Sequence, residues 1–187
     1  MIYEFCAENV TLLEKAMQAG ARRIELCDNL AVGGTTPSYG VTKAAVELAS
    51  NYDTTIMTMI RPRGGDFVYN DLEISIMLED IRLTAQAGSQ GVVFGALTAD
   101  KKLDKANLEK LIAASKGMEI VFHMAFDDLS DEDQLEAIDW LSQAGVTRIL
   151  TRAGVSGDSL EKRFDHYRRI LENAAGKIEI LPGGGID

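Results

Sequence analysis

Six residues with reactive side chains fall on one face of the short apolar segments that we expect to be strands. They combine carboxyl, thiol, guanidinium and imidazole groups, and they are Glu4, Cys6, Glu25, Cys27, Arg61 and His123. Alternate residues of a strand share a face, and Ile24 and Leu26 must face covering helices, so Glu25 and Cys27 face the other way. In a barrel of parallel strands such residues meet inside, and late strand positions place them at the C-terminal rim. We therefore expect a candidate active site at that rim.

Four groups are candidates for general acid–base catalysis: Glu4, Glu25, His123 and Asp127. His123 lies at the end of a predicted strand, and an imidazole of ordinary pKa exchanges protons near neutrality. Asp127 follows four residues later and could orient that ring. Glu4 and Glu25 need partners in a dry interior, and Arg61 is their natural counterion. The alternative is that these groups form a purely structural ion-pair network.

The segment MIRPRGGDFVY, residues 59–69, places two arginines and two glycines just after an apolar run. Guanidinium groups recognise carboxylate and phosphate through paired hydrogen bonds. The segment therefore indicates an anion site or a clamp on a catalytic carboxylate. Its predicted ligand-binding residues are Arg61, Arg63 and Asp66.

A second glycine-rich segment, PGGGI at 182–186, follows the last predicted strand. In many barrels, backbone N–H groups hold phosphate after the seventh and eighth strands. Three consecutive glycines, Gly183, Gly184 and Gly185, allow a phosphate to approach closely, and we predict them to be ligand-binding residues. An ordinary turn is the alternative.

The two cysteines, Cys6 and Cys27, occupy inward positions on adjacent predicted strands. Neighbouring strands lie about 4.8 Å apart, so both sulfur atoms could contact one metal ion. Thiolate, thioether and imidazole ligands suit soft Cu(I), and we predict Cys6, Cys27 and His123 as metal ligands, with Met57 or Met59 as a further donor. A buried cysteine can also be a small apolar filler, and methionines pack cores.

A repeat in the sequence predicts the elements that position these residues. QAGARRIEL begins at Gln18, QAGSQGVVF at Gln86 and QAGVTRILT at Gln143, each after a helical pattern. The glycine suits the left-handed end of a helix, so the repeat indicates helix, glycine cap and strand. Seven strands are predicted: 2–6, 23–27, 55–61, 91–95, 120–123, 148–151 and 178–181. We expect one α/β domain over residues 1–187, a TIM (β/α)8-type barrel that ends after the seventh strand, with the last βα unit missing or truncated. A doubly wound open sheet is the alternative.

The composition limits the partners of the chain. The 187 residues carry a net charge of −10 and are 46% hydrophobic, as in a soluble globular domain. The sequence has no Lys/Arg-rich run, so we expect neither nucleic acid nor a membrane as partner. The N-terminal residues lack the basic start of a signal peptide. We therefore expect a cytoplasmic protein with reduced thiols.

Seven motifs together resemble the CutC family of copper homeostasis proteins. They are ELC at 25–27, GGTTPSYG at 33–40, IRPRGGDFVY at 60–69, LED at 78–80, FHMAFD at 122–127, RILT at 148–151 and PGGGI at 182–186. The resemblance covers about seven barrel units and implies a TIM-barrel-like, cytoplasmic protein, often a homodimer. It links the chain to copper handling and makes Cu(I) binding a hypothesis.

The sequence departs from the pattern of that family in the barrel mouth. Met124 stands where the family usually has arginine, and Arg152-Ala153-Gly154 stands where it usually has Ser-Gly. We hypothesise that Arg152 supplies the missing guanidinium from the next strand, which makes Arg152 a predicted ligand-binding residue. The family barrel also continues beyond the glycine segment.

Two functions remain open at this point, beside a scaffold without chemistry. The first is a copper protein that binds Cu(I) at the C-terminal mouth of the barrel. The second is a TIM-barrel enzyme that acts by acid–base chemistry on a small anionic, phosphorylated molecule. No lysine ends a predicted strand, which disfavours Schiff-base chemistry, and we expect no organic cofactor.

Overall fold

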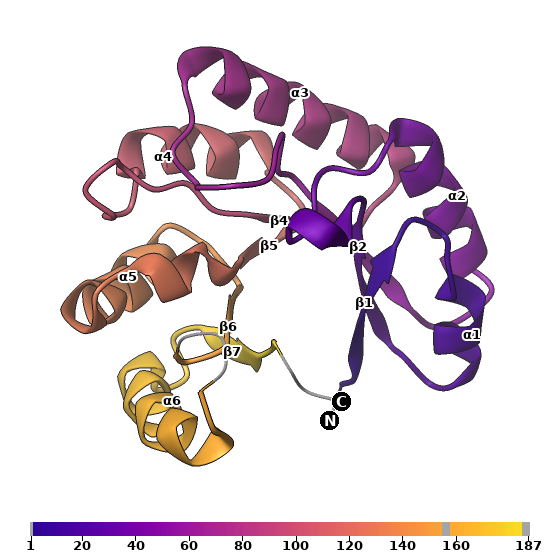
Figure 1. Cartoon of the computed structure of the whole chain (residues 1–187). Coiled ribbons are helices and arrows are strands. Elements are labelled where there is room, and N and C mark those ends of the chain that lie inside the picture. Colours follow the sequence, from indigo (N-terminus) through magenta and orange to yellow (C-terminus); the bar gives the residue numbers. More distant parts are fainter. Residues whose placement is uncertain (1, 155–157, 185–187) are drawn as a thin grey trace.

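The computed structural model describes residues 2–154 and 158–184, in which seven parallel strands form one sheet in the order β1-β2-β3-β4-β5-β6-β7. The strands are β1 (Glu4–Glu8), β2 (Arg23–Cys27), β3 (Thr55–Met59), β4 (Gly91–Phe94), β5 (Glu119–Phe122), β6 (Arg148–Thr151) and β7 (Glu179–Pro182). The sheet curls with β1 and β7 as its two edges, and helices lie on its outer side (Figure 1). This confirms the predicted barrel-type fold that ends after the seventh strand.

Helices alternate with the strands along the chain. They are α1 (Leu13–Gln18), α2 (Tyr39–Ala49), α3 (Asp71–Ala87), α4 (Lys105–Ala114), α5 (Asp131–Gln143) and α6 (Leu160–Ala174), with short 3-10 turns η1 (Leu30–Val32) and η2 (Met124–Asp128). The repeat glycines Gly20, Gly88 and Gly145 have φ angles of 102°, 88° and 92°. This left-handed backbone favours glycine and confirms the predicted pattern of helix, glycine cap and strand. Of the helices in the described residues, none is long and apolar enough to cross a membrane.

The two faces of the sheet bury different residues. The outer face packs against the helices and contributes apolar side chains such as Ile24, Phe94 and Phe122. The inner face has its own smaller apolar cluster, which consists of Cys27, Met57, Met59, Val93, Val121 and Leu150. The alternation predicted for the strands is therefore correct, because a period of two separates the two faces.

Strand boundaries differ from the prediction at three site residues, Glu4, Arg61 and His123; the last follows Phe122, where β5 ends. The first strand begins at Glu4 instead of Ile2, and Glu4 pairs in register with Arg23, the first residue of β2. Glu4 therefore lies at the N-terminal end of the barrel and not late in its strand. β3 ends at Met59, so Arg61 lies just beyond the strand.

Candidate functional site

Arg61 is the centre of a hydrogen-bond network at the C-terminal end of β3. Its side chain is almost fully buried. Nη1 donates to the carbonyl oxygens of Val32 and Gly34 at 2.9 and 2.8 Å, and Nη2 donates to that of Gly65 at 2.8 Å. The guanidinium also lies 5.0 Å from the centre of the Phe67 ring. Arg61 thus joins the loop after β2 to the loop after β3.

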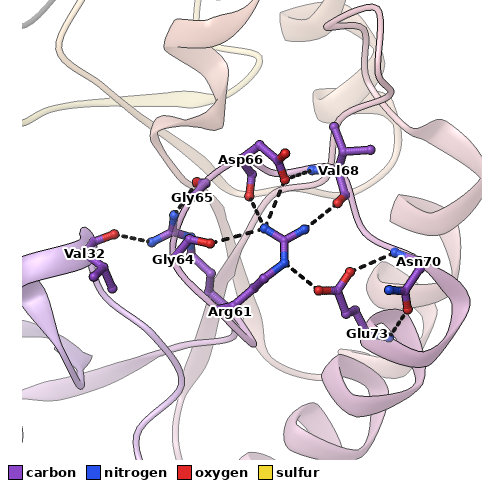
Figure 2. Close-up of polar contacts among 9 residues, drawn as sticks. Val32, Arg61, Gly64, Gly65, Asp66, Val68, Asn70 and Glu73 are labelled. Carbon is purple, nitrogen blue, oxygen red and sulfur yellow. Dashed lines mark hydrogen bonds and ion pairs between the residues drawn. The ribbon is translucent and has the colours of Figure 1, made fainter.

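Arg63 organises the next part of the same loop, where Figure 2 labels Asp66, Val68, Asn70 and Glu73. Its Nε donates to Glu73 of α3 at 2.5 Å, and its Nη1 forms an ion pair with Asp66 at 3.0 Å. It also donates to the backbone carbonyl of Val68. Glu73 in turn accepts from the backbone N–H of Asn70, which caps α3. Both arginines of the segment therefore bind loop groups, and the ligand-binding roles of Arg61, Arg63 and Asp66 stay predictions.

The expected pairing of Glu4 and Glu25 with Arg61 is wrong. Glu4 forms an ion pair with Arg23, and both side chains are mostly buried. The guanidinium of Arg61 already binds three carbonyl groups beyond the other end of the strands. Glu25 lies in the barrel interior, where burial and then the negative charges of Cys6 and Glu4 raise the pKa of its carboxyl well above the usual value.

Two arginines that the sequence analysis did not single out form an ion-pair network at the N-terminal end of the barrel. Arg148 pairs with Glu179 at 2.9 Å and with Glu119 at 3.0 Å. Arg23 reaches Glu179 at 3.6 Å, across from β2 to the edge strand β7. Strand alternation places Arg23 on the same face as Glu25, and that pattern could have identified it. The ion-pair network of Arg61 with Glu4 and Glu25 is therefore not formed, and a different network of Arg23 and Arg148 lies at the opposite end of the barrel.

The two thiols lie near each other on the inner face. Cys27 is buried and Cys6 is exposed. A hydrogen bond from the Cys27 thiol is the main cause that lowers the pKa of Cys6, while the same contact raises the pKa of Cys27. Met57 and Met59 belong to the same inner cluster as Cys27.

The third predicted metal ligand, His123, lies apart from the thiols. In the part of the chain that the structure describes, no group of three or more His, Cys, Asp or Glu residues is arranged to hold a metal ion. The structure thus brings Cys6 and Cys27 together and leaves His123 out of that set. A metal site that contains both cysteines therefore needs donors other than His123 beside the two thiols.

His123 is buried at the end of β5, beside the loop that carries Phe67. Its Nδ1 accepts a hydrogen bond from the N–H of Ala125 at 3.2 Å, and its ring centre lies 4.7 Å from that of Phe67. Burial, followed by the charge of Arg61, lowers the pKa of His123 to about 3. The ordinary pKa expected for His123 is therefore wrong, and the imidazole is neutral at pH 7.

This lowered pKa predicts a specific dependence of stability on pH. The imidazole has a pKa of 6.5 in the unfolded chain and about 3 in the folded protein, so between these values the unfolded chain binds more protons. The contribution to stability is complete above about pH 6.5 and is lost as the pH falls towards 3, by up to about 1.4 kcal/mol per pH unit. Urea unfolding of His123→Leu should show a weaker loss than the parent protein between about pH 6.5 and pH 4. If the free energy of unfolding changed with pH equally in His123→Leu and in the parent protein, the buried neutral state of His123 would be contradicted.

Asp127 binds groups of β6 and not His123, which corrects the expected pairing. Its carboxylate accepts from the Thr151 hydroxyl and from the N–H of Arg152, and the Nε of Arg152 lies 3.7 Å away. Burial is the main cause that raises the pKa of Asp127. In addition, Nη2 of Arg152 contacts Sδ of Met124 at 3.1 Å. Arg152 therefore lies directly beside the position where the guanidinium is missing, as the compensation hypothesis requires, and its ligand role stays a prediction.

The glycine segment after β7 lies next to these groups. A Cβ atom at Gly183 would be 2.5 Å from Leu150, and one at Gly184, whose φ is +77°, would be 3.1 Å from Met124. Arg163 donates to the carbonyl oxygen of Gly184 at 2.9 Å. Close packing accounts for both glycines, and their phosphate role stays a prediction. Gly185 lies outside the described residues.

Two known proteins match almost the whole of this chain in sequence. A CutC-family protein of Enterococcus faecalis is 53% identical over 186 residues, which cover 100% of this chain and 89% of that protein. The human copper homeostasis protein cutC homolog is 41% identical over 185 residues, or 99% of this chain and 65% of the human protein.

Solved structures give the same result for the fold. A crystal structure of a CutC protein from Streptococcus agalactiae superimposes with a TM-score of 0.96 at 46% identity, over 100% of this chain and 89% of that one. An aldolase, QR15, superimposes with a TM-score of 0.71 at 16% identity, over 100% of this chain and 80% of that one. The aldolase shows a likeness of fold alone. The sequence profile of the CutC family matches residues 1–187, and the chain therefore belongs to the CutC family of copper homeostasis proteins.

Proposed function

We propose that this protein takes part in copper homeostasis by binding Cu(I) between Cys6 and Cys27. The observation that supports the proposal is the contact between the two thiols, which lowers the pKa of Cys6. A lower pKa increases the thiolate fraction, and the thiolate is the form that binds metal. The ion is cargo in this proposal and not a resident cofactor.

The donor atoms around the thiols suit a soft monovalent ion. Cys27 packs in one buried cluster with Met57 and Met59, so the cluster contains thioether groups as well as a thiol. Thiolate and thioether ligands select Cu(I) over harder ions. Cys6 is exposed and provides a way in, while Cys27 is buried and protected from water.

The proposal also includes a cellular location and an oligomeric state. Two unpaired thiols persist in a reducing compartment, so we place the protein in the cytoplasm. We further propose a homodimer, on the resemblance described above.

The test is an anaerobic titration of the reduced protein with Cu(I) against a competing chelator. The parent chain should bind one Cu(I) tightly, and Cys6→Ser/Cys27→Ser should lose this binding because both sulfur ligands are gone. Met59→Leu should weaken binding. Met77→Leu, which changes a buried methionine of the outer core, should leave it unchanged. Weak binding by the parent chain, or binding that survives loss of both thiols, would overturn the proposal.

The second candidate function is acid–base catalysis on a small phosphorylated molecule. Burial raises the pKa of both Glu25 and Asp127, and a raised pKa favours the role of a carboxyl group as a general acid. Arg152 contacts Asp127, Gly184 lies beside Arg152, and these two residues would hold the phosphate. Turnover of a phosphorylated small molecule that Asp127→Asn abolishes would support this function, and turnover that survives both Asp127→Asn and Glu25→Gln would exclude it.

A further inference from the structure

Three buried polar atoms that form no well-aligned hydrogen bond with a protein group belong to residues that surround one loop at the barrel mouth. They are Nε of Arg61, the hydroxyl oxygen of Tyr69 and Nε2 of His123, three of only six such side-chain atoms among the described residues. The three side chains are 4%, 7% and 3% exposed. Buried polar groups of this kind nearly always have a hydrogen-bond partner, so this cluster indicates a missing one.

The unpartnered nitrogen of His123 is a donor. Nδ1 accepts from the N–H of Ala125, so in the neutral ring the hydrogen is on Nε2. Gly95 leaves room for this orientation, because a Cβ atom there would lie 2.7 Å from both Cε1 and Nδ1 of the ring. The ring is thus held with a single N–H free to bind an acceptor.

The other two groups are a donor and a hydroxyl that can donate. Arg61 uses Nη1 and Nη2 for backbone carbonyls, and its Nε–H remains. Burial raises the pKa of Tyr69, while the charge of Arg61 and a side-chain hydrogen bond with Arg61 act to lower it. The charge of Arg61 also contributes to the lowered pKa of His123, so the three groups are neighbours. No carboxylate among the described residues forms an ion pair with Arg61, whereas Arg63 is paired with Asp66 and Glu73. The cluster is therefore a set of donors around an uncompensated positive charge.

Phe67 covers the Arg61 and His123 side of this donor cluster. Its ring lies over the guanidinium of Arg61 and against the ring of His123, and it is only half-buried. Phe67 comes from the same loop as Arg61 and Tyr69. A ligand would reach the donors by displacing this one ring.

We infer that Arg61, Tyr69 and His123 form a binding site for a small oxyanion, a carboxylate or a phosphate, beneath Phe67. Oxygen acceptors match three donors, and a negative charge matches Arg61. In this site His123 acts as a neutral hydrogen-bond donor and neither as a metal ligand nor as a base. The site is separate from the thiol pair and does not depend on copper.

The test measures binding of inorganic phosphate and of oxalate to the full chain by calorimetry. Saturable binding of one of them is expected, and the tighter ligand identifies phosphate or carboxylate as the natural group. Tyr69→Phe and His123→Leu should each weaken it about tenfold or more, because each removes one hydrogen bond to a charged ligand. Phe67→Ala should increase the rate at which the anion binds, because the ring that covers the donors is gone.

Three controls separate this site from the others. Tyr39→Phe changes an exposed tyrosine and should have no effect. Affinity that is lost in Arg152→Ala but kept in Tyr69→Phe would place the anion at the glycine segment and overturn the inference. Cu(I) titration of Tyr69→Phe should match the parent chain.

If His123→Leu fails to fold, Tyr69→Phe decides alone. Absence of saturable binding to both anions, or equal affinity in Tyr69→Phe, would overturn the inference.

Discussion

Arg61→Ala is expected to destabilise the protein by about 3 kcal/mol or more, because three carbonyl groups, one buried and two partly buried, lose a charged donor at once. These are the carbonyls of Val32, Gly34 and Gly65, which belong to two different loops. The variant also loses the contact with the Phe67 ring. At this chain length the change corresponds to about 6–12 °C in Tm, measured by thermal and urea unfolding.

Two further variants show whether the geometry of Arg61 matters or only its charge. Arg61→Lys keeps the charge but cannot reach three carbonyls with one ammonium group, so it should lose most of the same stability. Arg82→Ala is the control, because its pair with Glu79 on α3 is about half exposed and such pairs contribute little. Stability of Arg61→Ala within the range of Arg82→Ala would show that the network does not hold the loops.

Arg23→Met is expected to destabilise the protein by about 3–5 kcal/mol at neutral pH, because it leaves the charge of Glu4 buried without a partner. The side chains of Arg23 and Glu4 are only 5% and 11% exposed. The variant also removes the contact between Arg23 and Glu179 of the edge strand β7. Urea unfolding at constant pH measures the effect.

The preceding residue provides a matched control. Arg22 pairs with Asp53, but these side chains are 56% and 98% exposed, so Arg22→Met should change stability by well under about 1 kcal/mol. The double variant Arg23→Met/Glu4→Gln should recover part of the loss, because it removes the unpaired charge. A double variant as unstable as Arg23→Met would contradict the role of the buried charge.

The inner and outer faces of the strands were predictable from the sequence because they depend on a local period of two. Glu25 and Cys27 face inward as expected, and the repeat glycines end their helices with left-handed backbone. The order of strands was also predictable, since helices between consecutive strands require parallel neighbours. Each of these conclusions uses residues that are close in the sequence.

The partners of the charged residues were not predictable in the same way. The pairing of Glu4 with Arg61 failed because a shift of the first strand by two residues moves Glu4 to the opposite end of the barrel. Arg61 then satisfies carbonyl groups of two loops, and no residue pattern marks a carbonyl as an acceptor. The prediction of an ordinary pKa for His123 was wrong for a related reason. The burial of the ring, to which Phe67 contributes, and the charge of Arg61 depend on the segment after β3, which is distant from His123 in the sequence.

The sequence by itself therefore determined the barrel-type fold, the inward thiols and the membership in the CutC family, because these follow from local periodicity and motifs. Only the tertiary structure decided which donor meets which acceptor. A hydrogen bond or ion pair depends on atoms within about 3–4 Å, and that distance is fixed by strand register and loop path. For this reason the donors beneath Phe67 emerged only from the folded chain.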